Sequence, residues 1–270
     1  MTLQHSQADL DQLRRLEPAV SWQAKMIAHW GEVIAVGPFL ALLHRDTDSI
    51  WLNYAAPREP LGSDEEVAEG LGELGRIFAD RKRVLRIGFN ERLFPRLPRL
   101  LEEHGFTLQE RAPFMICTQS DFRPLSNPDV SVRFLRATDS DSDLAAYQSI
   151  VSQVLGDGSW QPTPAAILRF CAEVESADHR RHALAKIGDT PVGTGFISSA
   201  GGVSEVHKIA TAPACRRRRV ATTVTSFMLQ DRFDSGDTLA WLTATDTIAQ
   251  AVYQRLGFRL VGERLYYQTG

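Results

Sequence analysis

The sequence predicts an α/β fold in which a twisted, mostly antiparallel mixed sheet is flanked by helices and built twice along the chain. Apolar runs of strand length, bounded by Gly, Pro and Asp, alternate with segments whose apolar residues recur at helical spacing. Some expected strands are joined by tight turns such as Gly188-Asp189 and others through helices, which indicates both antiparallel and parallel pairs. The length of 270 residues suits two domains of ordinary size.

Composition and charge exclude several classes of protein. Of the 270 residues, 43% are hydrophobic and 23% are charged, which is typical of a globular chain. The net charge of −3 gives no basic field that would recruit nucleic acid, and the longest apolar stretch, residues 33–43, is too short to cross a bilayer. The three cysteines are widely spaced, and neither zinc-ligand spacing nor a signal-peptide pattern occurs. We therefore expect a cytoplasmic protein with no metal, no membrane contact and no nucleic-acid partner.

The second half alternates strands and helices. Strands are expected over residues 130–135, 182–187, 191–198, 204–211, 238–245 and 258–267, and helices over residues 140–155, 165–175, 220–232 and 248–256. Gly156 is expected to end the first of these helices. Asp246 is expected to cap the last helix, and Gly257 to stop it in a left-handed conformation.

The first half resembles a degraded copy of the second. Gly105-Phe106 begins a segment similar to the one at Gly257-Phe258, and both segments follow an expected helix and lead into an apolar strand. An expected strand over residues 84–89 precedes the first of these helices, as residues 238–245 precede the second. The copies are offset by about 152 residues, and the Pro-rich segment 122–130 separates them. We therefore expect domains at residues 1–125 and 126–270.

The candidate binding site lies in residues 204–223, SEVHKIATAPACRRRRVATT, where a strand ends, a turn follows and a helix begins. The first N–H groups of a helix lack partners within the helix and, together with the helix dipole, form an anion site. Arg216, Arg217, Arg218 and Arg219 add four positive charges at the same place. This arrangement predicts a ligand that carries a diphosphate.

Two motifs connect this site to a known family. Arg216-Arg-Arg-Arg219-Val-Ala221, which follows Pro213, resembles the Arg/Gln-x-x-Gly-x-Gly/Ala cofactor loop of the GNAT family of acyl-CoA N-acyltransferases, with Arg219 in place of the middle glycine. Residues 246–258, DTIAQAVYQRLGF, are similar to that family's Asn-x-x-Ala-x-x-Leu-Tyr-x-x-x-Gly-Phe. The resemblance covers residues 130–270 well, whereas over residues 30–120 it is a weak likeness of the fold. It implies two tandem GNAT-like domains, of which 126–270 is catalytic.

The resemblance implies acetyl-CoA as the co-substrate, without a metal. The residues that it places at the cofactor are Ile209, Ala210, Thr211, Arg216, Arg217, Arg218, Arg219, Val220, Ala221 and Asp246. The main chain of residues 209–211 would bind the pantetheine arm as an extra strand and polarise the thioester carbonyl. If the missing glycine serves a positive φ, Arg219 costs roughly 1–2 kcal/mol. If it serves close backbone approach, the Arg219 side chain must turn away from the phosphates.

The resemblance also implies the catalytic groups. Glu205 would take the proton of the attacking amine, and Tyr253 would protonate the departing thiolate. His207 shares a face of the strand with Glu205 and is an alternative base or a relay. Other family members carry the base on the next strand, where this chain has Trp241, which favours Glu205. A structural role stays open for Glu205, for His207 and for Tyr253.

The equivalent segment of the first half is expected to bind no cofactor. It follows an expected strand over residues 50–54, and there Ser63 and Glu66 fit a capping box that would satisfy the helix's own N–H groups. Residues 64–66 are acidic and would repel an anion, and Leu101 stands in place of the tyrosine. We therefore expect domain 1–125 to bind no CoA and to serve a structural role.

The sequence as a whole predicts an N-acetyltransferase that moves an acetyl group from acetyl-CoA to a primary amine by direct attack in a ternary complex. The acceptor is an unspecified small molecule or peptide, and the loop 156–164, with Asp157 and Trp160, is either its wall or a solvent-facing loop. One alternative is a non-catalytic CoA-binding or regulatory module, which Arg219 and Asp246 favour. Another is a nucleic-acid-associated protein that uses the four arginines. The oligomeric state is open, and a monomer is compatible with halves that pair internally.

Overall fold

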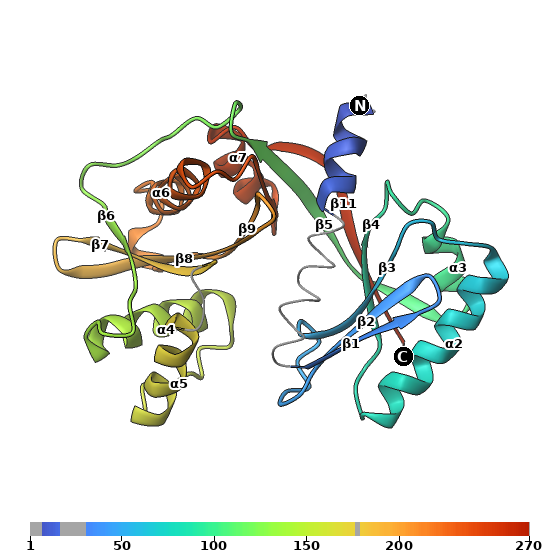
Figure 1. The fold of residues 1–270 in the computed structure, drawn as a ribbon. Coiled ribbons are helices and arrows are strands. Elements are labelled where there is room, and N and C mark those ends of the chain that lie inside the picture. The colour runs from blue at the N-terminus through green and yellow to red at the C-terminus, as the bar shows by residue number, and fades with distance from the viewer. Residues whose placement is uncertain (1–6, 17–30, 176–178, 270) are drawn as a thin grey trace. The chain divides into compact units, whose positions relative to one another are not determined.

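The computed structural model describes residues 7–16, 31–175 and 179–269, and the chain forms two compact units (Figure 1). The first unit comprises Met1–Phe114 with Leu260–Gly270, and the second comprises Met115–Arg259. These units divide at other residues than the expected domains because the last strand of the chain belongs with the first unit. None of the described helices is long and apolar enough to cross a membrane.

The second unit contains a mixed sheet, as predicted. Its strands are the end of β5 (Phe106–Thr118), β6 (Ser131–Phe134), β7 (Arg180–Ile187), β8 (Thr190–Ala200), β9 (Val203–Thr211) and β10 (Leu239–Thr243). They lie in the order β5-β10-β9-β8-β7-β6. The strands from β6 to β9 pair antiparallel with their neighbours, whereas β9 and β10 are parallel.

Four described helices flank this sheet. They are α4 (Asp141–Leu155) and α5 (Pro164–Glu175) on one face, and α6 (Val220–Asp234) and α7 (Thr247–Arg255) on the other (Figure 1). Glycines in β8 let α6 approach closely: a Cβ at Gly193 would lie 2.4 Å from Cγ1 of Val220. A Cβ at Gly195 would lie 2.6 Å from Cγ1 of Val224. This packing fixes the first turns of α6 against the sheet beside β9.

The first unit repeats this plan. Its strands are β1 (Gly31–Val36), β2 (Phe39–His44), β3 (Asn53–Pro57), β4 (Arg86–Asn90), the beginning of β5 and β11 (Arg259–Thr269). Its described helices cover residues 7–16, α2 (Asp64–Asp80) and α3 (Leu97–Glu103). The strand order is β1-β2-β3-β4-β11-β5. Buried apolar residues of α2 and α3 form one core with Ile87, Phe89, Leu265 and Tyr267 of the sheet.

The order of elements supports the predicted internal repeat. Three strands, a helix, a strand, a helix and a strand follow one another from β1 and again from β7. Both α3 and α7 lead to a left-handed glycine, with φ of +80° at Gly105 and +99° at Gly257. The sequence did not predict that the last strands are exchanged: β11 lies between β4 and β5, and β5 lies beside β10.

One expected strand begins later than predicted. The strand expected over residues 50–54 starts at Asn53, because residues 49–53 form a turn in which the N–H groups of Leu52 and Asn53 donate to the Ser49 carbonyl, at 3.0 Å each. The Asn53 side chain reinforces this turn, since its Nδ2 donates to the carbonyls of Thr47 at 2.8 Å and Ser49 at 2.9 Å.

Candidate functional site

The candidate site begins where β9 loses its neighbour. β10 pairs with β9 only over the first three residues, from Val203 to Glu205. β9 then continues to Thr211 along β8 alone, so the edge of residues 207–211 that faces β10 has no strand partner among the described residues. Such an edge offers main-chain N–H and C=O groups to an extended ligand. The hydroxyl of Thr211, at the end of this edge, is buried and has no hydrogen-bond partner in the described part of the chain.

A β-bulge changes the direction of β9 along this edge. Thr194 pairs with Ala210 and Phe196 with His207, so two residues of β9, Lys208 and Ile209, stand opposite one residue of β8. Lys208 adopts a positive φ of 49°, and the Thr194 hydroxyl donates to its carbonyl at 3.3 Å. Bulges of this kind bend a strand and turn its groups in a new direction, often beside an active site.

The four arginines connect β9 to α6. After the short 3-10 helix Pro213–Cys215, both Arg217 and Arg219 have a positive φ, of 64° and 58°. The positive φ of Arg219 supports the first of the two explanations for the missing glycine. All four side chains are exposed, and no acidic group of the described residues pairs with them. Arg219 is the N-cap of α6 and gives no side-chain cap, so the first N–H groups of this helix are open to an anion.

Asn127 holds this loop in place, a role that the sequence analysis missed. Its Nδ2 donates to the Arg218 carbonyl at 3.0 Å, and its main-chain N–H donates to the Thr223 hydroxyl at 3.0 Å. The Thr223 hydroxyl in turn donates to the Arg219 carbonyl at 2.9 Å. Asn127 lies in the Pro-rich segment that was interpreted only as a linker. No sequence pattern connects it to residues about ninety positions later.

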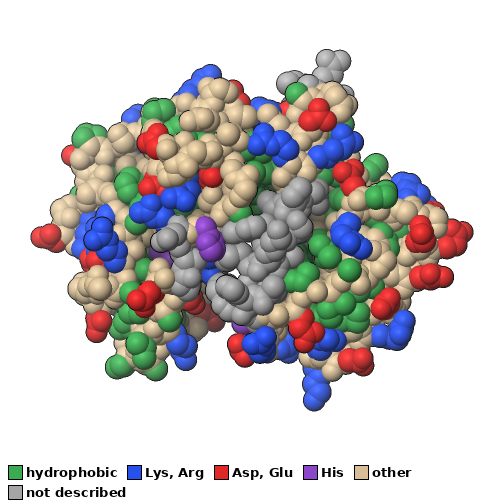
Figure 2. Space-filling model, viewed as in Figure 1, with side chains coloured by type: hydrophobic (Ala, Val, Ile, Leu, Met, Phe, Trp, Pro, Cys, Tyr) green, Lys and Arg blue, Asp and Glu red, His purple; other side chains and the backbone are tan. Residues whose placement is uncertain are grey.

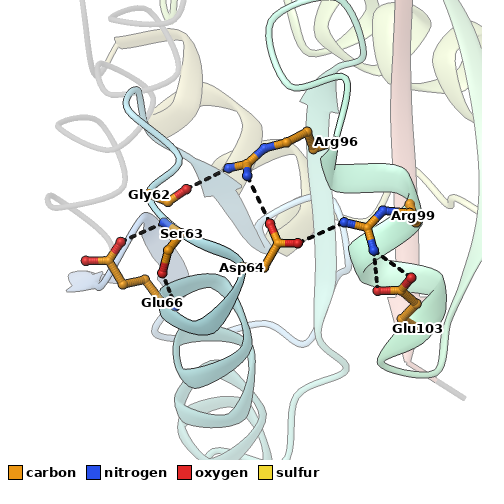
Figure 3. A network of polar contacts seen from close by, with 7 residues as sticks. All are labelled: Gly62, Ser63, Asp64, Glu66, Arg96, Arg99 and Glu103. Carbon is orange, nitrogen blue, oxygen red and sulfur yellow. Dashed lines mark hydrogen bonds and ion pairs between the residues drawn. The ribbon is translucent and has the colours of Figure 1, made fainter.

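The corresponding loop of the first unit is closed by its own side chains (Figure 3). The Glu66 N–H donates to the Ser63 hydroxyl at 3.2 Å, and the Ser63 N–H donates to the Glu66 carboxylate at 2.7 Å, which confirms the predicted capping box. Arg96 and Arg99 of the α3 region each pair with Asp64 at 2.9 Å. The start of α2 therefore has an acidic side chain and a side-chain cap. The start of α6, by contrast, has four arginines and no side-chain cap.

Charges of both signs are mixed on the face of the molecule that Figure 2 draws. Lys and Arg side chains are interspersed with Asp and Glu on the face drawn in Figure 2, in keeping with a net charge of −3. Local clusters rather than an overall field therefore decide where an anion is attracted.

Glu205 and His207 are brought together on β9. His207 Nε2 lies 3.1 Å from the Glu205 carboxylate and 3.3 Å from the Ser198 hydroxyl. The Glu205 side chain is 15% exposed and that of His207 is 29% exposed, so both are sheltered but accessible. The His207 ring also packs against Phe196, with 5.3 Å between centroids. A carboxylate joined to an imidazole at the splayed end of β9 can accept a proton directly or through the ring.

Tyr253 and Asp246 lie on α7. Asp246 is the N-cap, and its carboxylate accepts the Ala249 N–H at 2.7 Å, which confirms its predicted capping role. Burial raises the pKa of the Tyr253 phenol to about 12, and the negative charge of Asp246 adds to this. Tyr253 packs edge-on against Phe258 with centroids 5.8 Å apart. The phenol therefore stays protonated at neutral pH and is able to donate.

Polar groups of the expected acceptor loop form hydrogen bonds within the loop and to the helix before it. The Asp157 carboxylate accepts the N–H of Ser159 at 2.9 Å and its hydroxyl at 2.6 Å. The N–H of Trp160 donates to the Ser152 hydroxyl at 3.2 Å. Asp157 thus closes a turn, as in the solvent-facing interpretation of this loop.

His182 lies on β7 and packs against Phe196, the same ring that His207 contacts, but it is a structural residue. It is 1% exposed, its Nδ1 lies 3.1 Å from the Tyr147 hydroxyl, and its ring packs between Phe170 and Phe196. Burial lowers its pKa to about 3, and the charges of Lys208 and Arg180 add to this, so His182 is neutral in the folded protein.

Acid should therefore destabilise the protein through His182. Between pH 6.5 and pH 3 the unfolded chain takes up a proton that the folded chain excludes, so stability is complete above pH 6.5 and falls below it. We expect a loss of about 1.4 kcal/mol per pH unit from this group at its steepest. Urea unfolding of wild type and His182→Phe at pH 7, 5.5 and 4.5 measures it. Equal pH slopes for the two proteins would contradict the assignment.

Known proteins resemble the chain in sequence and fold. Residues 145–258 match the model of the acetyltransferase (GNAT) family. A GCN5-related N-acetyltransferase from Kribbella flavida is 26% identical, with a TM-score of 0.75, over 93% of this chain and 94% of its own. A tandem GNAT protein from the clavulanic acid biosynthesis pathway shares the fold at 13% identity, with a TM-score of 0.62, over 86% of this chain and 78% of its own. No curated protein matches the chain significantly.

Proposed function

Because the chain belongs to the GNAT superfamily, we propose that its second half moves an acetyl group from acetyl-CoA to a primary amine by direct attack in a ternary complex. The observation that carries this proposal is the uncapped start of α6, which directly follows the unpaired edge of β9. A diphosphate suits the first feature and a pantetheine arm the second, and the two are joined in that order in CoA.

The residues present fit such a co-substrate. Main-chain N–H groups around residues 217–221 would hold the diphosphate, with Arg216–Arg219 adding charge. Residues 209–211 would hold the pantetheine arm, and the Thr211 hydroxyl, which bonds to none of the described residues, could form a hydrogen bond to it. The bound thioester supplies an acyl group that an amine can attack without a metal.

Glu205 and Tyr253 would handle the two protons of the reaction. Glu205, with His207 beside it, takes the proton that the amine loses when its nitrogen bonds to the acyl carbon. Tyr253 gives a proton to the sulfur as the carbon–sulfur bond breaks, and its raised pKa ensures that the phenol carries this proton at neutral pH. The first half would bind no CoA, because Ser63, Glu66 and Asp64 occupy the equivalent helix start (Figure 3).

Calorimetric titration with acetyl-CoA tests the proposal, followed by thiol release across a panel of amines. We expect one binding site per chain and turnover with at least one class of amine. Binding without thiol release for any amine would favour the non-catalytic alternative. No binding at all would overturn the assignment.

Arg219→Gly should stabilise the protein while preserving the loop. The Arg219 backbone is left-handed, which costs an L-residue roughly 1–2 kcal/mol and glycine almost nothing, although glycine gains freedom when unfolded. We expect the free energy of unfolding to rise by up to about 1 kcal/mol. Affinity for CoA should fall less than tenfold, since one exposed charge is lost.

Arg218→Gly is the matched control for this prediction. It removes the same charge from the same loop, at a residue that is not among those with positive φ, so it should lower stability. Thermal unfolding of both variants, with calorimetry for CoA, makes the comparison. Equal changes in stability would contradict a strained Arg219.

A further inference from the structure

The face of the first unit's sheet that lies away from α2 and α3 carries an apolar cluster of Leu42, Tyr54 and Ala56 on β2 and β3, and polar side chains on β4. Side chains alternate along a strand, and Ile87 and Phe89 of β4 point into the helical core, so Arg86, Gly88 and Asn90 share the opposite face. β11 pairs with β4 so that Tyr266 lies opposite Gly88. The Tyr266 ring covers Gly88, where a Cβ would lie 2.9 Å from Cε1 of the ring.

Arg86 is buried between two aromatic rings on this face. Its side chain is 3% exposed, and the guanidinium carbon lies 4.1 Å from the Trp51 ring and 4.2 Å from the Tyr266 ring. Those two rings stand at 77° to each other, so they enclose the guanidinium as two walls of a corner. Stacking on aromatic faces fixes the position of an arginine without using its hydrogen-bond donors.

The donors of Arg86 are largely unused. Nη2 donates to the Glu110 carboxylate at 3.0 Å, but Nε and Nη1 are buried and have no hydrogen-bond partner among the residues that the structure describes. Within the same described ranges, Nδ2 of Asn90, on the same face of β4, is also buried without a partner. Buried donors without acceptors are costly and rare in native proteins. Because every unused group here is a donor, the missing partner is an acceptor.

The charges on this face also favour an acceptor, and in particular an anion. Arg264, 5% exposed, reaches along β11 to place its Nη2 3.6 Å from the Cβ position of Gly88, and its charge acts on Arg86. Glu110 is the carboxylate to which Arg86 donates, and its side chain is 44% exposed, so this pair lies partly in water. Arg264 adds a second positive charge close to Arg86, which favours an anion beside it.

We propose that the first unit binds a small oxyanion, the carboxylate or phosphate group of a ligand, at the unused donors of Arg86. Trp51 is the cover of this site. Its side chain is 58% exposed on the turn before β3, so its movement would admit a ligand without disturbing the core. The site is separate from the proposed CoA site and does not depend on it. It would give the half without a CoA site a ligand of its own.

Tryptophan fluorescence and calorimetry with inorganic phosphate and with acetate, at constant ionic strength set by chloride, test this proposal. We expect saturable binding of at least one of them, with a change in Trp51 emission that Trp51→Phe removes. Phosphate alone would identify a phosphate site, and acetate alone a carboxylate site. Binding of neither would overturn the proposal.

Two substitutions are expected to act in opposite directions. Arg86→Met should weaken binding at least tenfold, whereas Glu110→Gln should tighten it several-fold because a competing charge is removed. Arg99→Met, at an exposed arginine of α3, removes one charge elsewhere in the unit and should leave binding unchanged. If Arg86→Met does not fold, Glu110→Gln still tests the proposal. Binding of the anion that is unchanged or weaker in Glu110→Gln would overturn it.

Discussion

Glu205→Gln should lower kcat/KM for the acceptor amine by about 10²–10⁴-fold, the range expected when a positioned general base is lost. Glutamine keeps the size of the side chain and can still hydrogen-bond to His207, but it cannot take up the amine proton. Affinity for acetyl-CoA should change little, because Glu205 is not among the groups proposed to hold the diphosphate. Thiol release at saturating acetyl-CoA measures the rate, and calorimetry measures the affinity.

His207→Gln is the companion variant, because His207 Nε2 lies 3.1 Å from the Glu205 carboxylate. If Glu205 acts alone, His207→Gln should retain most of the activity. If the proton passes through the ring, both variants should fall together, and the double variant should be little worse than either. Full turnover by Glu205→Gln would remove Glu205 from the mechanism and leave the fold unaffected.

Tyr253→Phe should lower kcat by roughly 10²-fold, the lower part of the range for general acid catalysis. The change removes only the hydroxyl, so the packing against Phe258 is kept, and binding of acetyl-CoA should persist. Because the pKa of Tyr253 is raised to about 12, wild type should show no loss of activity from this group between pH 6 and pH 10. The ratio of the wild-type kcat to the kcat of Tyr253→Phe should therefore be constant across that pH range. Rate profiles of both proteins against pH measure this ratio.

Tyr147→Phe is the control for the loss of a tyrosine hydroxyl. Tyr147 is fully buried, and its hydroxyl donates to the Gly195 carbonyl at 3.3 Å. We expect this variant to lose stability and to keep its kcat. Wild-type turnover by Tyr253→Phe would show that Tyr253 only packs on the helix, as an inner-face aromatic does.

Local sequence patterns were sufficient for most of the elements near the candidate site. The strand that ends before Pro213, the helix from Val220 and the cap at Asp246 are each encoded within a few residues, by periodicity, by a helix breaker and by a side-chain acceptor. The capping box at Ser63 and Glu66 is equally local, and the structure confirms it. These features depend on neighbours in the chain and not on distant contacts.

Other features depend on residues that meet only in the folded chain. The exchange of β5 and β11 follows from pairing between segments more than a hundred residues apart, such as Arg264 with Asn90, and each strand has the same local pattern whichever partner it takes. Asn127 was interpreted as part of a linker because its two partners, Arg218 and Thr223, lie far along the chain. The turn at Ser49 was missed because a side chain, that of Asn53, closes it.

Periodicity and the charges of adjacent residues were enough to predict the class of fold, the repeat and the position of the helix start that we propose as an anion site. The positive φ of Arg219, which supports the first of the two explanations for the missing glycine, is visible only in the folded loop, since a backbone φ is set by what the loop is packed against. The tertiary structure alone revealed the unpaired edge of β9 and the enclosed donors of Arg86. Burial and the absence of a partner are properties of the surroundings, and the surroundings are assembled from distant parts of the chain.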